Sequence, residues 1–175
     1  MSSDARRLEH TNSTSPEKLR IVFVCMGNIC RSPTAEAVMQ TLVERIGQAH
    51  RFELDSAGTH AYHVGNPPDQ RSQLAAKLRG YDLSSLRARQ IAAADFVRFD
   101  LILAMDRDNL HLLRQACPPN QRHKRGLFLD YAGHCDEEEV PDPYYGGLDG
   151  FDHVLDLAEA AANGLIDHWL SLQRK

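Results

Sequence analysis

A cysteine and an arginine enclose a short loop whose composition suits the binding of phosphate. Residues 25–31 read Cys-Met-Gly-Asn-Ile-Cys-Arg and follow an apolar run at residues 21–24. A loop that passes from a strand into a helix directs several backbone N–H groups, and the positive end of the helix dipole, at one point. Arg31 adds a planar cation that can bind two oxygens, and Cys25 places a nucleophile beneath the bound phosphorus. The segment therefore predicts a phosphate-binding loop with a reactive thiolate at its base.

Three further residues in and after this loop suit its closure around an anion. Gly27 allows the backbone to curve closely around the ligand. Asn28 tolerates the left-handed conformation, and its side chain can fix the loop in place. Ser32 can cap the helix that follows, and it can also donate a hydrogen bond to Cys25 that eases departure of the thiolate. The two roles of Ser32 are compatible, and both stay open.

An acid is also needed, because the leaving oxygen must be protonated and a water molecule must then be activated. Asp142 is the candidate, since a proline on each side stiffens its loop. Tyr144 and Tyr145 follow it and can form an aromatic wall for a substrate that carries a ring. A simple turn with packed tyrosines fits the same residues, so sequence chemistry alone leaves both interpretations open.

The composition is that of one ordinary globular domain. The chain has 175 residues, 42% of them hydrophobic and 25% charged, and a formal net charge of −4. The charge argues against a general nucleic-acid partner, and no apolar stretch has the length of a membrane span or a secretory signal. Four cysteines do not form a dense disulfide framework, which favours a reducing, cytoplasmic location. His60 and His63 lack a third and fourth ligand, so we expect no metal.

Predicted strands and helices alternate after a polar, flexible leader at residues 1–18. We expect strands at residues 21–24, 51–55, 100–104 and 126–129. We expect helices at residues 32–46, 70–79, 92–98, 107–116 and 150–172. This alternation predicts an α/β fold in which helices cover both faces of a parallel sheet. Ligands of such sheets bind at the carboxyl ends of the strands, where residues 25–31 lie.

The loop motif, extended by Ser-Pro, and the segment Asp-Pro-Tyr-Tyr-Gly at residues 142–146 together resemble the low-molecular-weight protein tyrosine phosphatases. The similarity covers roughly residue 19 to the end, and it includes residues 55–58, 88–90, 95–96 and 105–106. The resemblance implies one domain at residues 19–175, with a four-stranded parallel sheet flanked by helices and no metal or organic cofactor. It implies hydrolysis of phosphotyrosine through a phosphocysteine intermediate. It assigns the nucleophile to Cys25, the phosphate-binding arginine to Arg31 and the general acid to Asp142.

The resemblance also assigns a supporting network behind the loop to Asn28, Ser32 and Ser56. Many members of the family carry a histidine bonded to the loop asparagine, at a position where this chain has Leu86. Support of Asn28 must then come from elsewhere, with Ser56 as the candidate, or be weaker. A position at the rim that is tryptophan in some members is Tyr62 here, so stacking can survive with a different substrate preference.

The expected substrate-binding residues lie in the loop and on its rim. They are Met26, Gly27, Asn28, Ile29, Cys30, Ser32, Tyr62, Tyr144 and Tyr145. In the family that this chain resembles, a cysteine at position 30 can form a reversible disulfide with the nucleophile; a small buried side chain fits equally well. The acidic run at residues 136–139 is expected to be a solvated loop.

Other functions are less compatible with the sequence. An arsenate reductase needs a closely spaced cysteine pair, whereas Cys117 and Cys135 lie far apart in the chain. Phosphatases that act on phosphoarginine tend to carry threonine where this chain has Ile29. A non-catalytic phosphopeptide-binding module would not need both Cys25 and Asp142. We therefore expect a monomeric enzyme whose partners are phosphotyrosine-containing proteins, not nucleic acid or membrane.

Overall fold

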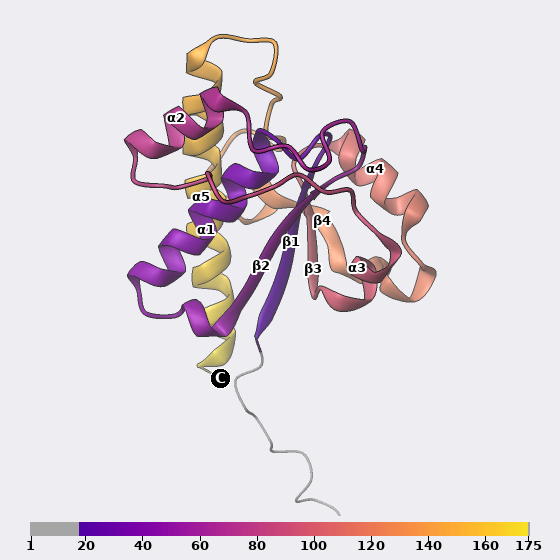
Figure 1. Ribbon diagram of the computed structural model, residues 1–175. Coiled ribbons are helices and arrows are strands. Elements are labelled where there is room, and N and C mark those ends of the chain that lie inside the picture. The colour runs from indigo at the N-terminus through magenta and orange to yellow at the C-terminus, as the bar shows by residue number, and fades with distance from the viewer. Residues whose placement is uncertain (1–17, 175) are drawn as a thin grey trace, which may run out of the picture.

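Four strands form a parallel sheet in the computed structural model, which describes residues 18–174 (Figure 1). The strands are β1 (Leu19–Cys25), β2 (Phe52–Gly58), β3 (Leu101–Ala104) and β4 (Arg125–Leu127). Their spatial order is β2-β1-β3-β4, and every neighbouring pair is parallel. The predicted leader at residues 1–18 lies, except for its last residue, outside the described residues.

The apolar run in β1 reflects burial on both faces of the sheet. Ile21 and Phe23 belong to the larger hydrophobic core, whereas Val22 and Val24 belong to a second core on the other face. Side chains alternate between the two faces of a strand, so a central strand covered on both sides needs an unbroken apolar sequence.

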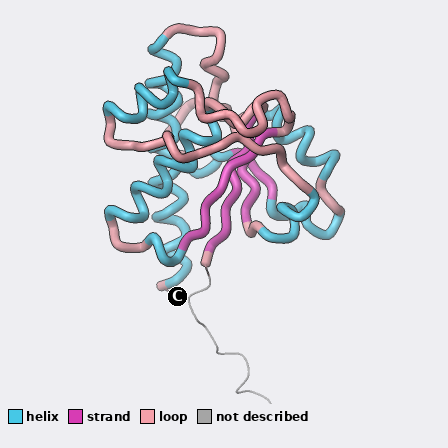
Figure 2. The backbone as a smooth tube through the Cα atoms, in the orientation of Figure 1, coloured by secondary structure: helices cyan, strands magenta, loops and turns pink. Residues whose placement is uncertain are grey.

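Helices cover the two faces, as Figures 1 and 2 show. The larger core includes residues of α1 (Arg31–Arg45), α2 (Gln70–Leu78) and α5 (Leu148–Gln173). The second core includes residues of α3 (Ala93–Arg98) and α4 (Arg107–Ala116). This arrangement confirms the predicted α/β fold. Within residues 18–174, no helix is both long and apolar enough to cross a membrane.

The predicted boundaries of three strands were wrong. β1 runs from Leu19 to Cys25, beyond the expected residues 21–24, because it pairs with β2 over that whole length. β4 ends at Leu127, because the next residues form a 3₁₀ turn (Phe128–Tyr131), and Asp130 Oδ2 accepts a hydrogen bond from the Leu127 amide at 3.3 Å. β2 continues beyond residue 55 to Gly58, because it stays in register with β1 up to the pair Cys25 and Gly58. The extension places the end of β2 directly behind the predicted phosphate-binding loop.

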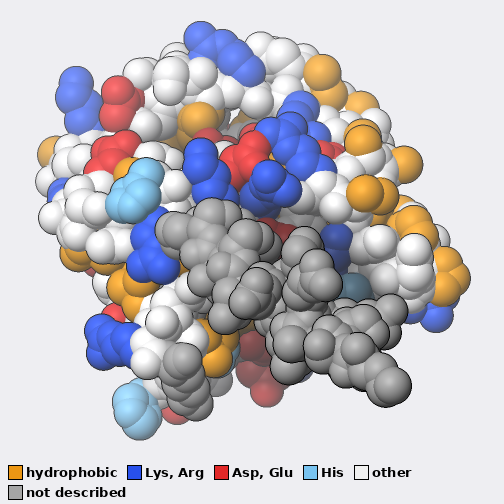
Figure 3. Space-filling model, turned by 90° about the horizontal axis from the view of Figure 1, so that it is seen from below, with side chains coloured by type: hydrophobic (Ala, Val, Ile, Leu, Met, Phe, Trp, Pro, Cys, Tyr) orange, Lys and Arg blue, Asp and Glu red, His pale blue; other side chains and the backbone are white. Residues whose placement is uncertain are grey.

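The two ends of the sheet differ in character. At the end where the strands begin, Glu53 forms ion pairs with Arg20 and Arg98; Figure 3 views the molecule from this end, where basic and acidic side chains lie side by side. At the opposite end, the loops that follow β1, β2 and β3 converge (Figure 1). Cys25 lies at that convergence, as expected for parallel sheets.

Candidate active site

The loop at residues 25–31, called the phosphate-binding loop below, turns several carbonyl groups away from its centre. The carbonyls of Cys25, Met26 and Ile29 accept hydrogen bonds from the amides of Thr59, His60 and Asp69, at 2.8, 3.0 and 2.8 Å respectively. Because C=O and N–H point in opposite directions across a trans peptide, the amides that follow these carbonyls face the inside of the loop. The first turn of α1 adds N–H groups without acceptors in the helix. The loop thus presents a set of donors suited to an anion.

Asn28 holds the loop from behind. Its φ of 57° is the only left-handed value of a non-glycine residue in the described part of the chain. Its Nδ2 donates to Ser32 Oγ at 2.8 Å and to Ser56 Oγ at 2.9 Å, and its Oδ1 accepts from the Arg89 amide at 3.1 Å. Ser32 Oγ lies 3.0 Å from Cys25 Sγ. A continuous chain of hydrogen bonds therefore links β2, the loop asparagine and the thiol.

These contacts replace the support that a histidine at position 86 would give. Leu86 is half-buried and packs against the larger core. The Arg89 backbone amide satisfies Asn28 instead, and the Arg89 side chain is held by Asp95 at 2.9 Å and Asp55 at 3.1 Å. Sequence reasoning found Ser56 but missed the backbone of Arg89, because a main-chain donor leaves no signal in residue type.

Arg31 is almost fully buried and is oriented by a second carboxylate. Its Nη1 donates to Asp106 Oδ2 at 2.5 Å and to the Val140 carbonyl at 3.1 Å. Burial lowers the pKa of the guanidinium, but the charges of Cys25 and Asp106 outweigh this, and the net pKa lies above its ordinary value. The cation is therefore permanent. Asp106 also caps α4 by accepting from the Asn109 amide at 2.8 Å.

The role of Asp106 beside Arg31 was not found from the sequence. A signal existed, because Asp106 follows the carboxyl end of β3, and β3 is the neighbour of β1 in the sheet. The strand order is needed to use this signal, and the sequence alone does not provide it.

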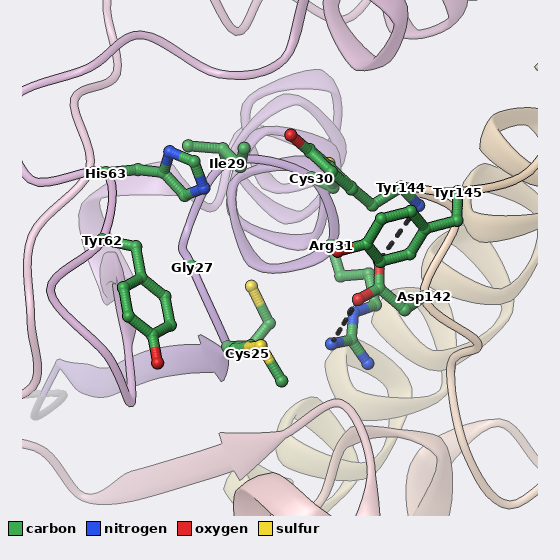
Figure 4. A pocket seen from close by; sticks show the side chains of 11 residues that line it. Cys25, Gly27, Ile29, Cys30, Arg31, Tyr62, His63, Asp142, Tyr144 and Tyr145 are labelled. Atoms are coloured by element: carbon green, nitrogen blue, oxygen red, sulfur yellow. Dashed lines mark hydrogen bonds and ion pairs between the residues drawn. The ribbon is translucent and has the colours of Figure 1, made fainter.

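Asp142 lies beside the guanidinium of Arg31 in the wall of the cavity, as Figure 4 shows. Its Oδ2 lies 3.7 Å from Arg31 Nη2, and its Oδ1 accepts from the Tyr144 amide at 3.1 Å. The Asp142 side chain is 40% exposed, in contrast to 3% for Arg31. Tyr144 and Tyr145 pack edge to face, with ring centroids 4.9 Å apart. Residues 140–147, which carry these side chains, are called the acid loop below.

The two loops enclose one cavity of about 210 Å³ (Figure 4). Cys25, Arg31 and Asp142 all line it. The other predicted residues in its walls are Met26, Gly27, Ile29, Cys30, Tyr62, Tyr144 and Tyr145. Asn28 and Ser32 were predicted to bind substrate, but they do not line the cavity; they lie behind the loop, at 2% and 0% exposure.

The remaining wall comes from the segment after β2. Tyr62 is exposed at the rim and stacks on the His60 ring with centroids 5.0 Å apart. His63 also lines the cavity, which the sequence did not indicate. The end of β2 packs closely against the phosphate-binding loop because residue 58 is glycine. A Cβ at Gly58 would lie 2.7 Å from the Met26 carbonyl oxygen.

Cys30 lies in the loop but is not equivalent to Cys25. It is 5% exposed, and burial raises its pKa to about 12. Cys30 is therefore a neutral thiol near pH 7 and a poor nucleophile. Both cysteines are free thiols in the structure, and the proposed disulfide between them stays a prediction.

The acidic run at residues 136–139 is exposed but largely paired. Glu137 lies 2.6 Å from His153 of α5, and Glu138 and Glu139 pair with Arg107 at the start of α4. The run thus connects the segment before the acid loop to two helices, beyond the solvated role that was expected. In the part of the chain that the structure describes, no group of three or more His, Cys, Asp or Glu residues is arranged to hold a metal ion.

Comparisons with known proteins agree with this geometry. The family model described as "Low molecular weight phosphotyrosine protein phosphatase" matches residues 20–175. A low molecular weight phosphotyrosine protein phosphatase of Schizosaccharomyces pombe is 44% identical, over 85% of this chain and 96% of the yeast protein. A crystal structure of a protein tyrosine phosphatase from Entamoeba histolytica, with Hepes in its active site, superposes with a TM-score of 0.86 at 40% identity, covering 89% of this chain and 99% of that one. The structure of a Drosophila arginine phosphatase superposes with a TM-score of 0.80 at 33% identity, covering 86% and 98% of the two chains.

Proposed function

The chain belongs to the low molecular weight phosphotyrosine protein phosphatase family, a family of hydrolases, and we propose that it hydrolyses phosphotyrosine in proteins through a phosphocysteine intermediate on Cys25. One observation carries the proposal. A thiol, a permanently charged guanidinium and a carboxyl group line a single cavity. Nucleophile, phosphate ligand and acid are thereby available to one bound phosphate ester.

Substrate binding uses the phosphate-binding loop and Arg31. The inward amides and the guanidinium bind the equatorial oxygens of the phosphoryl group, and their charge stabilises the transition state. Asp106 and the Val140 carbonyl occupy Nη1 of Arg31, which fixes the plane of the guanidinium. Preorganised donors of this kind need no rearrangement during the reaction.

In the first step, the Cys25 thiolate attacks phosphorus as the bond from phosphorus to the phenolic oxygen breaks. The leaving oxygen takes the proton of the Asp142 carboxyl group, so the products are tyrosine and the phosphocysteine enzyme. Asp142 suits this role because its side chain is 40% exposed and lines the same cavity as Cys25 (Figure 4).

In the second step, the Asp142 carboxylate removes a proton from water, and the resulting hydroxide attacks phosphorus. The bond from sulfur to phosphorus breaks, releasing inorganic phosphate and the thiolate. Ser32 Oγ, 3.0 Å from Cys25 Sγ, donates a hydrogen bond that stabilises the departing thiolate.

The walls favour an aryl ester. Tyr62, Tyr144 and Tyr145 line the cavity above the phosphate-binding loop, so that a flat phenyl ring can pack between aromatic side chains. Cys25 lies at the base, and only a long side chain brings its phosphate within reach. Phosphoserine and phosphothreonine are too short to do so.

Phosphoarginine is the second candidate substrate, because one structural relative is named an arginine phosphatase. Ile29 lines the cavity of this chain, and its apolar surface favours a phenyl ring over a guanidinium. We therefore rank phosphotyrosine first.

The proposal extends to the setting of the enzyme. Cys25 must remain a free thiol, which is favoured in a reducing, cytoplasmic compartment. We propose that the domain spans residues 19–175 and acts as a monomer on protein substrates.

The test compares purified enzyme on three matched peptides that carry phosphotyrosine, phosphoserine or phosphoarginine. We expect turnover of the phosphotyrosine peptide, inhibition by vanadate, no loss in the presence of a metal chelator, and near-complete loss in Cys25→Ser. Undiminished activity of Cys25→Ser would overturn the mechanism. Faster turnover of phosphoarginine would overturn the substrate assignment.

A further inference from the structure

Arg71 lies in the first turn of α2, beside the acid loop but outside the cavity walls. Its side chain binds the Asp69 carboxylate in a bidentate manner, with Nε to Oδ1 at 3.1 Å and Nη2 to Oδ2 at 2.9 Å. Asp69 is the cap of α2 and also accepts from the Arg71 amide at 2.8 Å. Two parallel hydrogen bonds fix the plane of a guanidinium as well as its position.

This pair is connected to the phosphate-binding loop. The Asp69 amide donates to the Ile29 carbonyl at 2.8 Å. The Asp69 side chain is only 12% exposed, whereas that of Arg71 is 38% exposed. The carboxylate therefore forms a fixed base next to the loop, and the guanidinium projects from it toward solvent and the acid loop.

The guanidinium reaches two aromatic rings. Its Cζ lies 4.7 Å from the ring centre of Phe151 and 5.5 Å from that of Tyr144. Both distances fall within the range of a cation–π interaction. Phe151 is 2% exposed in α5, so it forms part of the rigid core, whereas Tyr144 belongs to the acid loop. Arg71 thus connects a fixed ring to a ring of the loop.

Tyr144 in turn determines the orientation of Asp142, because its amide donates to Asp142 Oδ1 at 3.1 Å. We propose that Arg71 is a positioning residue for Asp142: it holds Tyr144, and with it the carboxyl group, over the cavity. This inference rests on the acid role of Asp142 in the proposed function. Loss of Arg71 then weakens protonation of the leaving group but leaves attack by the thiolate intact.

Arg79 supplies a matched control at the other end of the same helix. It caps the C-terminus of α2, and its Nη1 pairs with Asp156 at 2.8 Å and Glu159 at 3.1 Å, both in α5. Like Arg71, it connects α2 to α5, but it has no contact with the acid loop among the ion pairs and hydrogen bonds described. A purely structural role would make the two arginines equivalent.

The experiment measures kcat/KM for phenyl phosphate, which has a poor leaving group, and for p-nitrophenyl phosphate, which has a good one. We expect Arg71→Leu to lower kcat/KM for phenyl phosphate about five- to tenfold, and for the nitrophenyl ester less than about twofold, as expected for one lost cation–π contact. Arg79→Leu should leave the ratio of the two values unchanged, even where it lowers the unfolding midpoint. Arg71→Lys, which keeps the charge but loses the planar guanidinium, should give an intermediate ratio.

Equal losses for both esters, or the same change of ratio in Arg79→Leu, would overturn the inference. If Arg71→Leu does not fold, Arg71→Lys decides, and a ratio equal to that of the parent enzyme would overturn it. Asp142→Asn separates the two levels of the argument. If Asp142→Asn keeps the parent's ratio of kcat/KM for the two esters, both the acid role of Asp142 and the positioning role of Arg71 are excluded. A changed ratio in Asp142→Asn with a parental ratio in Arg71→Leu removes only the positioning role.

Discussion

The two loops that form the cavity are built in opposite ways. In the phosphate-binding loop, Cys25, Asn28 and Arg31 are 3%, 2% and 2% exposed, and each has a hydrogen bond with a buried partner. In the acid loop, the Asp142 side chain is 40% exposed and Tyr145 is 93% exposed. The nucleophile therefore lies in the protein core, and the acid lies at its surface.

The difference follows from where each loop lies in the fold. The phosphate-binding loop joins the central strand β1 to α1 and is backed by β2, so any movement breaks buried hydrogen bonds. The acid loop leads directly into α5 and has few side-chain contacts, among them that of Arg71 with the Tyr144 ring. Arg107 pairs with Glu139, directly before the loop. We infer that the first loop contributes to both stability and activity, whereas the second contributes mainly to activity.

The largest effect on stability is expected from Asn28→Ala. The change removes three hydrogen bonds and places alanine at a positive φ, which together should lower the free energy of unfolding by about 3 kcal/mol. Activity should fall about 100-fold, because the loop amides lose their fixed positions. Urea unfolding and kcat/KM measure the two effects. Ser56→Ala, which removes a single bond to Asn28, is the control and should show a smaller loss of both; unchanged stability of Asn28→Ala would contradict the comparison.

An intermediate effect on stability is expected from the ionisation of Glu36, which lies on α1, the helix that follows the phosphate-binding loop. Burial raises its pKa to about 7, against an ordinary value of 4.5, with a smaller lowering by Ser56 and a raising by Asp55. The unfolded chain therefore releases this proton at lower pH than the folded protein does. Stability from this group is full below about pH 4.5 and is lost as the pH rises to about 7, by about 2–3 kcal/mol in all.

Glu36→Gln should remove that dependence. Urea unfolding between pH 4.5 and pH 8 should give a flatter curve, with the variant more stable than the parent near neutral pH. A parent and a variant with parallel curves would show that Glu36 does not titrate differently in the folded state.

The smallest effect on stability is expected from Asp142→Asn. The side chain is exposed, so the free energy of unfolding should change by less than about 0.5 kcal/mol. By contrast, kcat/KM for phenyl phosphate should fall about 100-fold, as is typical for loss of a general acid, and less for the nitrophenyl ester. A large loss of stability would show that the acid loop is part of the folded core, and equal slowing of both esters would argue against the acid role.

The sequence could predict the residues of the phosphate-binding loop better than the residues that support it. The phosphate-binding loop was found because its function requires particular residues close together in the chain, and the apolar run of β1 predicted its place at the end of a buried strand. The partners of that loop were harder to find. Asp106 and the Arg89 amide reach it only through the strand order and through the backbone path after β2.

Hydrogen bonds that form only in the folded chain explain the errors in the predicted ends of β4 and β2. Residues 128–129 are apolar enough to continue a strand, but the Asp130 carboxylate bonds to the Leu127 amide and favours a turn. Residues 56–58 look like the start of a loop, but pairing with β1 keeps them extended. The contacts of Arg71 in α2 could not be predicted from the sequence either, because its two aromatic partners, Tyr144 and Phe151, lie far from it in the chain.

Rapid quench followed by mass spectrometry tests the central claim most directly, because the claim is that phosphate passes through Cys25. The enzyme is mixed with an excess of p-nitrophenyl phosphate, whose good leaving group depends little on protonation by Asp142, and is then quenched during turnover and digested. We predict a phosphoryl group on the peptide that contains Cys25, absent from Cys25→Ser and more abundant in Asp142→Asn, in which hydrolysis of the intermediate is slowed. A phosphoryl group on another residue, or turnover without any phosphorylated peptide, would contradict the account.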